Sequence, residues 1–170
     1  MNILIVTDAN IFIDLLNIDL LDSFFKLSFE IHTTDLVLSE VIEPDPSTIE
    51  YFIKKGKLRV KGFTYNEMLV LNKLVLKNKG LSPQDCSCIY LSQELPAILL
   101  TGDNQLRKAA RKYKVDVHGI LWLLDQLIFQ KVISPKATIK KLDELRKTNI
   151  RLPKNECNKC IKKWSQKITL

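Results

Sequence analysis

The chain has 170 residues, 46% of them hydrophobic, which is enough for one substantial core but too short to predict two independent domains. No apolar stretch reaches the roughly 18 to 20 residues of a membrane span, and the start MNILIVTDAN lacks a basic leader and a cleavage site. We therefore expect a cytoplasmic protein with no membrane association. The pair Cys157 and Cys160 has no second pair or histidine near it in the sequence, so we expect thiols rather than a zinc site.

The formal net charge of +7 is concentrated near the end of the chain. Residues 131–170 hold 12 Lys and Arg against three Asp and Glu. Such a stretch attracts the phosphate backbone of nucleic acids, although a solvated helix face is the simpler explanation. Because the composition becomes polar and basic from about residue 153, we divide the chain into a domain at 1–152 and a basic C-terminal tail at 153–170.

The elements alternate along the chain. The strand candidates are 3–7, 29–33, 58–62, 97–101 and 115–119. The helix candidates are 20–27, 35–43, 47–55, 65–80, 82–95, 104–114, 120–133 and 136–149. Two of the strands, ILIVT and AILLT, are continuous apolar runs, which is typical of strands covered on both faces. The alternation predicts an α/β domain with a mainly parallel sheet.

An aspartate follows each of the two most hydrophobic strands. Asp8 follows the strand candidate 3–7 in the segment IVTDAN, and Asp103 follows the strand candidate 97–101 in the segment LLTGDN. The carboxyl ends of parallel strands open onto the crevice where ligands bind, so neighbouring strands would deliver both carboxylates to one site. Each aspartate also suits the N-cap of the helix that follows it, and the sequence leaves both interpretations open.

Two further acids lie on predicted helices. Asp85 stands at the third helical position of SPQD, where a capping box needs an acid, so a structural role explains it well. Glu40 is harder to explain in this way, because the predicted helix 35–43 is apolar nearly all round. A buried ionised carboxylate costs several kcal/mol unless a cation compensates it.

Converging carboxylates favour a divalent metal. Mg²⁺ and Mn²⁺ prefer oxygen ligands and often keep waters and substrate phosphates in their shell. Such an ion activates water and neutralises charge on a phosphodiester during hydrolysis. Asn10, Thr101 and Asn104 would orient the carboxylates or water by hydrogen bonding to them, unless they are simple turn and cap residues.

The helix predicted at 104–114 begins next to Asp103 and is strongly basic. Its cations would hold an RNA backbone beside the acids, although an exposed helix face explains each of them singly. The RNA-binding candidates are Arg107, Lys108, Arg111 and Lys112.

The four acids, in this order and context, resemble the motifs of the PIN domain, a metal-dependent ribonuclease fold. The matching positions are Asp8 in IVTDAN, Glu40 in LSEVIE, Asp85 in SPQDCSCIYLS and Asp103 in LLTGDN. The segment VHGILWLLDQLIFQKVI is similar to a helix that begins with glycine in one bacterial branch of the family. The resemblance covers roughly residues 3–150.

The resemblance implies a three-layer α/β/α sandwich and a nuclease domain at 1–152 that uses Mg²⁺ or Mn²⁺ to cleave RNA. It also implies that Asp8, Glu40, Asp85 and Asp103 are the catalytic residues and metal ligands. Many small bacterial members are toxins held inactive by an antitoxin protein, so an antitoxin is a candidate partner, as is a second copy in a homodimer.

The resemblance is incomplete at two places. Many members carry a further acid near the fourth, where this chain has Asn104, and the tail has no counterpart in the pattern. A catalytically weak or inactive PIN-like module that binds nucleic acid or protein is therefore the alternative to a ribonuclease.

Overall fold

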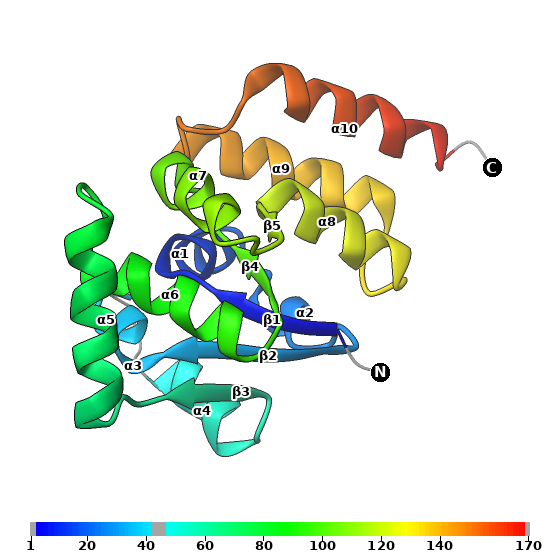
Figure 1. Ribbon diagram of the computed structural model, residues 1–170. Coiled ribbons are helices and arrows are strands. Elements are labelled where there is room, and N and C mark those ends of the chain that lie inside the picture. Colours follow the sequence, from blue (N-terminus) through cyan, green and yellow to red (C-terminus); the bar gives the residue numbers. More distant parts are fainter. Residues whose placement is uncertain (1–2, 42–46, 169–170) are drawn as a thin grey trace.

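The computed structural model describes residues 3–41 and 47–168, within which five parallel strands form one sheet in the order β3-β2-β1-β4-β5. The strands are β1 (Ile3–Thr7), β2 (Phe29–Thr34), β3 (Leu58–Lys61), β4 (Ile98–Leu100) and β5 (Val117–His118). Each predicted strand is present, and the parallel sheet is confirmed (Figure 1).

Helices connect the strands and continue past the last one. They are α1 (Ala9–Asn17), α2 (Leu21–Phe24), α3 (Asp35–Leu38), α4 (Ser47–Lys54), α5 (Tyr65–Lys77), α6 (Pro83–Glu94), α7 (Asn104–Lys112), α8 (Ile120–Phe129), α9 (Pro135–Thr148) and α10 (Lys154–Gln166). In the part of the chain that the structure describes, no helix is both long and apolar enough to cross a membrane.

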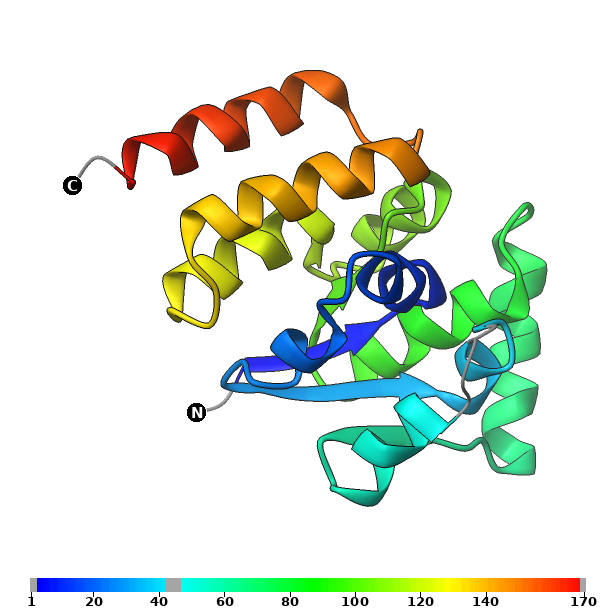
Figure 2. The same cartoon turned by 180° about the vertical axis from the view of Figure 1, so that it is seen from behind.

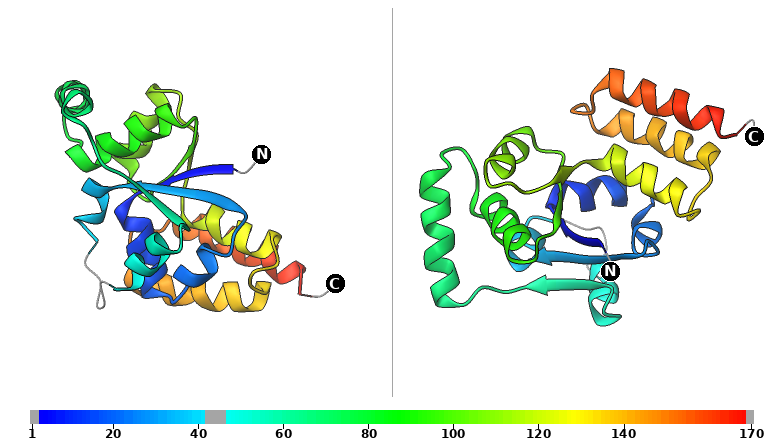
Figure 3. Two further views of the ribbon diagram at one scale, coloured as in Figure 1. Left: turned by 90° about the horizontal axis from the view of Figure 1, so that it is seen from below. Right: turned by 45° about the vertical axis from the view of Figure 1, so that its right-hand side comes forward.

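The sheet lies between two layers of helices, as the predicted three-layer sandwich requires. Side chains alternate across each strand, so Ile5 and Leu100 join one core while Val6 and Leu99 join the other. The first core contains residues of α1, α2, α4, α8, α9 and α10, and the second contains residues of α3, α6 and α7, with α5 packed against it. A view from below shows the two helix layers on opposite sides of the sheet, and the view from behind shows α9 on the side of α1 (Figures 2 and 3).

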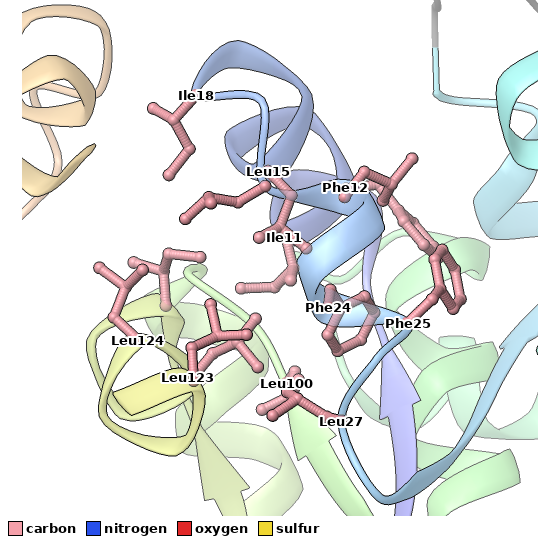
Figure 4. Close-up of a cluster of buried hydrophobic side chains, with 14 of the residues drawn as sticks. Ile11, Phe12, Leu15, Ile18, Phe24, Phe25, Leu27, Leu100, Leu123 and Leu124 are labelled. Carbon is pink, nitrogen blue, oxygen red and sulfur yellow. The ribbon is translucent and has the colours of Figure 1, made fainter. Parts of the chain in front are cut away.

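The first core is the larger, and it surrounds α1. Figure 4 shows the α1 side chains Ile11 and Leu15 facing Leu123 and Leu124 of α8, with Leu100 of β4 beside them. All five side chains are fully buried. This packing fixes α1, and with it the end of β1, against the sheet.

Local capping explains where several helices begin. The Ser82 hydroxyl accepts from the Asp85 amide at 3.0 Å, and the Asp85 carboxylate accepts from the Ser82 amide at 2.9 Å. Pro83 occupies the first helical turn, where its missing N–H is no loss. The predicted capping box is therefore confirmed, and it fixes the backbone of Asp85.

The predicted tail is helical and belongs to the first core. Cys157 and Trp164 on α10 are fully buried, and the Trp164 indole N–H donates to Asp125 on α8 at 2.6 Å. In Figure 1, α10 runs alongside α9 in the opposite direction. The lysines on the outer side of α10 gave the segment its basic composition, while the apolar side anchors it. Residues 1–2 and 169–170 lie outside the described part of the chain.

The helix predicted at 35–43 is shorter than expected. Helix α3 ends at Leu38, and Glu40 follows in an exposed turn, so Glu40 does not lie on a buried helix as predicted. Residues 42 and 43 of the predicted helix lie outside the described residues.

Candidate functional site

The first and fourth predicted acids lie at the same edge of the sheet. Strands β1 and β4 are neighbours with Thr7 opposite Leu100, and the Asp8 amide donates to the Leu100 carbonyl at 3.1 Å. Asp103 follows β4 by three residues and begins α7. The two most hydrophobic strands are therefore neighbours, which is the condition under which both carboxylates reach one edge of the sheet.

Asp8 is a buried carboxylate with several donors. It is 4% exposed and caps α1, with Oδ1 accepting from the Ala9 amide at 2.7 Å. Oδ2 accepts from Asn10 Nδ2 at 2.6 Å and from the Thr101 hydroxyl at 2.8 Å. These contacts fix the orientation of the carboxylate at the end of β1.

The Asp8 pKa is raised to about 6 despite these donors. Burial is the largest cause, and the negative charges of Asp85 and Glu40 add to it, while the hydrogen bonds from Thr101 and Ala9 oppose it. Asp8 is therefore a carboxylate that a nearby cation would stabilise in its ionised form.

Asn10 and Thr101 also join the ends of β1 and β4. The Asn10 side-chain oxygen accepts from the Gly102 amide at 2.8 Å, and the Thr101 hydroxyl accepts from the Asp103 amide at 3.0 Å. Both residues therefore contact Asp8 and the loop that leads to Asp103. Asn104 is exposed at the first position of α7.

Glu40 and Asp85 approach Asp8 from the β2 side of the sheet. Helix α6 is held to the end of β2 by a hydrogen bond between the Thr34 and Ser87 hydroxyls at 2.8 Å. The pKa of Glu40 is raised by partial desolvation and by the charge of Asp85. Together with the effect of both acids on Asp8, this coupling places the three carboxylates in one electrostatic environment.

Asp103 has a different environment. Its Oδ1 accepts from the amides of Gln105 and Leu106 at 2.7 and 2.8 Å, which makes it the N-cap of α7. The side chain is only half-buried. The charges that raise the Asp8 pKa belong to Asp85 and Glu40. The Asp103 carboxylate instead faces the first amides of α7.

The side chains as placed do not form a closed metal cage. Among residues 3–41 and 47–168, no group of three or more His, Cys, Asp or Glu side chains is close enough to hold one ion. Three of the predicted acids are nevertheless electrostatically coupled. An ion bound here would take one or two carboxylates and complete its shell with water or substrate oxygens, which is the usual arrangement for Mg²⁺.

The cations predicted on α7 divide into two kinds. The Arg107 guanidinium donates to the carbonyls of Thr101 at 2.8 Å and Val117 at 3.4 Å, and burial lowers its pKa. A Cβ on Gly119 would lie 2.9 Å from Arg107 Nη2, so glycine leaves the space that this contact needs. Arg107 therefore ties β4 to β5. The three remaining candidates are exposed: Lys108, Arg111 and Lys112.

A groove of about 810 Å³ begins at this edge of the sheet and extends along α1. Asn10 and Gly102 line its near end, and Asp14 of α1 lines it further along. Sequence reasoning missed Asp14, which is 6% exposed and has a pKa raised to about 6 by burial. The polar residues Asn10, Asp14 and Asn17 at helical spacing in an otherwise apolar segment were the available signal.

The sequence from residue 4 to residue 166 matches the family model described as PIN domain. The chain belongs to the PIN-domain family. A search of curated protein sequences found no match. The PIN family match includes α10, so the final helix lies within the extent of the family model.

Solved structures with the same fold include two that each cover about three quarters of this chain. PAE2754 from Pyrobaculum aerophilum superposes with a TM-score of 0.55 at 17% identity, over 75% of this PIN-domain chain and 96% of the other. A PilT N-terminus domain protein, SSO1118, from the hyperthermophilic archaeon Sulfolobus solfataricus P2 gives 0.52 at 20% identity, over 74% and 94% of the two chains. At these identities the likeness establishes the fold alone.

Proposed function

We propose that this PIN-domain protein is a metal-dependent endoribonuclease that hydrolyses RNA phosphodiester bonds. The observation that supports this best is the buried Asp8 carboxylate at the carboxyl end of the central strand, whose pKa is raised by burial and by the charges of Asp85 and Glu40. Mutually repelling carboxylates at a ligand-binding edge are what a divalent cation stabilises.

The residues present fit Mg²⁺ or Mn²⁺ held through few protein ligands. Asp8 and Asp85 would hold the ion, with Glu40 at the exposed rim. Asp85 uses Oδ2 in its capping box, and Oδ1 has no hydrogen-bond partner among the described residues. A bound ion would supply an activated water and neutralise charge on the phosphate.

The chain's own side chains prepare the site. The donors from Asn10 and Thr101 hold the Asp8 carboxylate in one orientation, and Thr101 at the same time fixes the Asp103 backbone. Asp103 uses only Oδ1 as a cap, which leaves Oδ2 available to orient water or the leaving group. The exposed cations Lys108, Arg111 and Lys112 of α7 would bind the RNA backbone beside these acids.

The test is cleavage of a labelled single-stranded RNA with Mg²⁺ or Mn²⁺, with EDTA, and by Asp8→Asn. We expect metal-dependent cleavage that EDTA and Asp8→Asn both abolish. Asp22→Asn is the matched control, because Asp22 is an exposed aspartate in the first turn of α2. RNA binding without cleavage under any metal would favour the alternative, a PIN-like binding module.

We extend the proposal to the toxin of a toxin–antitoxin pair, as the resemblance implies. Induced expression in a bacterial host should then arrest growth, and Asp8→Asn should remove the arrest. Growth arrest that persists in Asp8→Asn would contradict a toxin that acts by RNA cleavage.

A further inference from the structure

The groove beside the acids is continuous with the proposed catalytic site. Asn10 and Gly102 line the groove, and Asn10 also donates to Asp8 in the proposed catalytic site. From there the groove follows α1 toward the connection between α9 and α10. Its volume of about 810 Å³ lies within the roughly 300 to 1,000 Å³ of small-ligand pockets. An RNA strand that crosses the acids therefore meets this groove next.

Helix α1 presents a polar stripe to the groove. Asn10, Asp14 and Asn17 are spaced by four and three residues, so they lie on one side of the helix, and all three line the groove. At 1.5 Å of rise per residue, Asp14 lies about 6 Å further along α1 than Asn10. The opposite side of α1 is buried in the first core (Figure 4). The stripe thus leads away from the acids along the groove wall.

Asp14 is the buried polar group in this wall. Its side chain is 6% exposed, and both carboxylate oxygens accept from the single Asn149 Nδ2 at 3.0 Å. Two carboxylate oxygens offer about four acceptor positions. Asp14 therefore retains acceptor capacity for donors placed in the groove.

The hydrogen bond from Asn149 to Asp14 also fixes the wall of the groove opposite α1. Asn149 follows α9, and its side-chain oxygen accepts from the Arg151 amide at 3.0 Å. Both functional groups of Asn149 are thus engaged, one with α1 and one with its own loop. Arg151 is exposed, and Ile150 is 92% exposed beside it, so this wall offers one cation and one apolar surface.

The remaining acids of the groove are already paired. Asp125 accepts from Lys163 at 2.8 Å, and Glu156 accepts from Lys159 at 2.7 Å. Neither pair leaves an uncompensated negative charge against a polyanion. Asp14 forms no ion pair with a described cation, although the charge of Arg151 lowers its pKa.

We infer that this groove binds one unpaired guanine of the RNA next to the cleaved phosphodiester, and that Asp14 accepts hydrogen bonds from its Watson–Crick edge. The inference rests on the proposed ribonuclease function. Guanine presents the N1–H and the N2 amino group side by side, which matches the two oxygens of one carboxylate. The other bases place acceptors beside their single Watson–Crick donor. Unstacked bases of single-stranded RNA are commonly recognised through this edge.

The experiment measures base preference in binding. The full chain carrying Asp8→Asn, which blocks cleavage, is titrated with fluorescein-labelled uridine decamers that contain one central G, A, C or U. We expect the G decamer to bind at least about 10-fold more tightly, because good direct contacts to base edges discriminate between bases. Adding Asp14→Asn should reduce G to the affinity of the other bases, and adding Asp22→Asn should not.

A second pair of variants tests the groove itself. Ile13→Trp fills it from α1, where Ile13 lines it and is 39% exposed, whereas Leu69→Trp alters a 44% exposed leucine on α5 away from it. Ile13→Trp should remove the preference for G, and Leu69→Trp should keep it.

Several results would overturn the inference. RNA binding with equal affinity for the four bases, a preference for another base, or a preference for G that survives Asp14→Asn would each contradict it and leave the ribonuclease proposal standing. Failure to bind any decamer, together with the absence of cleavage by the unsubstituted chain, would overturn both proposals.

Discussion

Asp8 and Asp103 follow neighbouring strands, begin the next helix and accept backbone amides, but their surroundings differ. Asp8 is 4% exposed, and its pKa is raised to about 6. Asp103 is half-buried and accepts two amides of α7 through one oxygen. Position after a strand therefore does not by itself decide the chemistry of a carboxylate.

The difference between the two aspartates arises from the elements that pack around each of them. Asp8 lies between β2 and β4, where α6 brings Asp85 close and the turn after α3 brings Glu40 close. Asp103 lies further from the sheet, beyond Gly102, and its nearest donors are the free amides of α7. A metal-binding role is thus supported most strongly at Asp8, with Asp103 in a supporting position.

The largest expected effect is on cleavage by Asp8→Asn. Changes to residues that merely support metal ligands typically cost 10- to 100-fold, so loss of a direct ligand should lower the rate by at least about 100-fold. Single-turnover cleavage at saturating RNA measures this, and circular dichroism checks the fold. If Asp8→Asn lowered the cleavage rate by less than tenfold, the proposed difference in role between Asp8 and Asp103 would be contradicted.

The pH dependence of stability provides the second comparison. The Asp8 pKa is raised from 3.8 to about 6, so the folded state favours the protonated carboxyl and loses stability as the pH rises from about 4 to 6. A shift of about two units corresponds to about 3 kcal/mol. Asp8→Asn in EDTA should therefore be more stable than the unsubstituted chain at pH 7 and equal to it at pH 3.

Urea unfolding across this pH range measures the effect. Asp14 has a similarly raised pKa, so the Asp8→Asn chain should retain part of the pH dependence. If Asp8→Asn is clearly less stable at pH 7 without metal, the capping of α1 is the main role of Asp8.

A smaller effect should separate capping from chemistry at Asp103. Asp103→Ala removes the N-cap of α7 and should cost about 0.5–2 kcal/mol of unfolding free energy, whereas Asp103→Ser keeps a capping oxygen. Thermal unfolding should show Ser restoring most of the stability that Ala loses. Cleavage by Asp103→Ser should fall, but by less than in Asp8→Asn. Normal cleavage by Asp103→Ser would limit Asp103 to its cap.

The smallest effect concerns exposed cations of the final helix. Lys154, Lys162 and Lys167 are exposed on or beside α10, so replacing them with Gln should reduce RNA affinity without changing saturated cleavage. A lysine that binds a phosphate of single-stranded RNA contributes about 0.7 to the slope of log K against log salt, so each replacement should lower the slope by that amount. Filter binding across a salt series measures this. An unchanged slope would assign this face of α10 to another partner.

The strands near the site could be predicted because their signals are local, whereas the order of the strands in the sheet depends on long-range pairing and became known only from the structure. Continuous apolar runs at β1 and β4 predict buried parallel strands, and the Ser82 to Asp85 spacing predicts a capping box. The helix α10 was missed because its lysines outweigh its apolar side in composition. Cys157, Ile161 and Trp164 recur at spacings of four and three residues, which is the pattern of a packed helix.

The site was less predictable than the fold. The identity of the acids follows from motifs, but their burial does not, because it depends on how α6 and the turn after α3 pack against β1. Glu40 is exposed although most of the predicted helix around it is apolar, because α3 ends two residues before it. Asp14 lies in a mostly apolar segment of the sequence, and its place in the groove depends on distant residues such as Asn149, which donates to it.

The most direct test of the central claim is Mn²⁺ binding by isothermal titration calorimetry at pH 7. The chains to compare are the unsubstituted protein, Asp8→Asn and Asp103→Asn. Our account predicts that Asp8→Asn weakens Mn²⁺ binding by at least about 10- to 100-fold and that Asp103→Asn has a smaller effect. Unchanged Mn²⁺ affinity in Asp8→Asn, or a larger loss in Asp103→Asn, would contradict a metal site centred on Asp8.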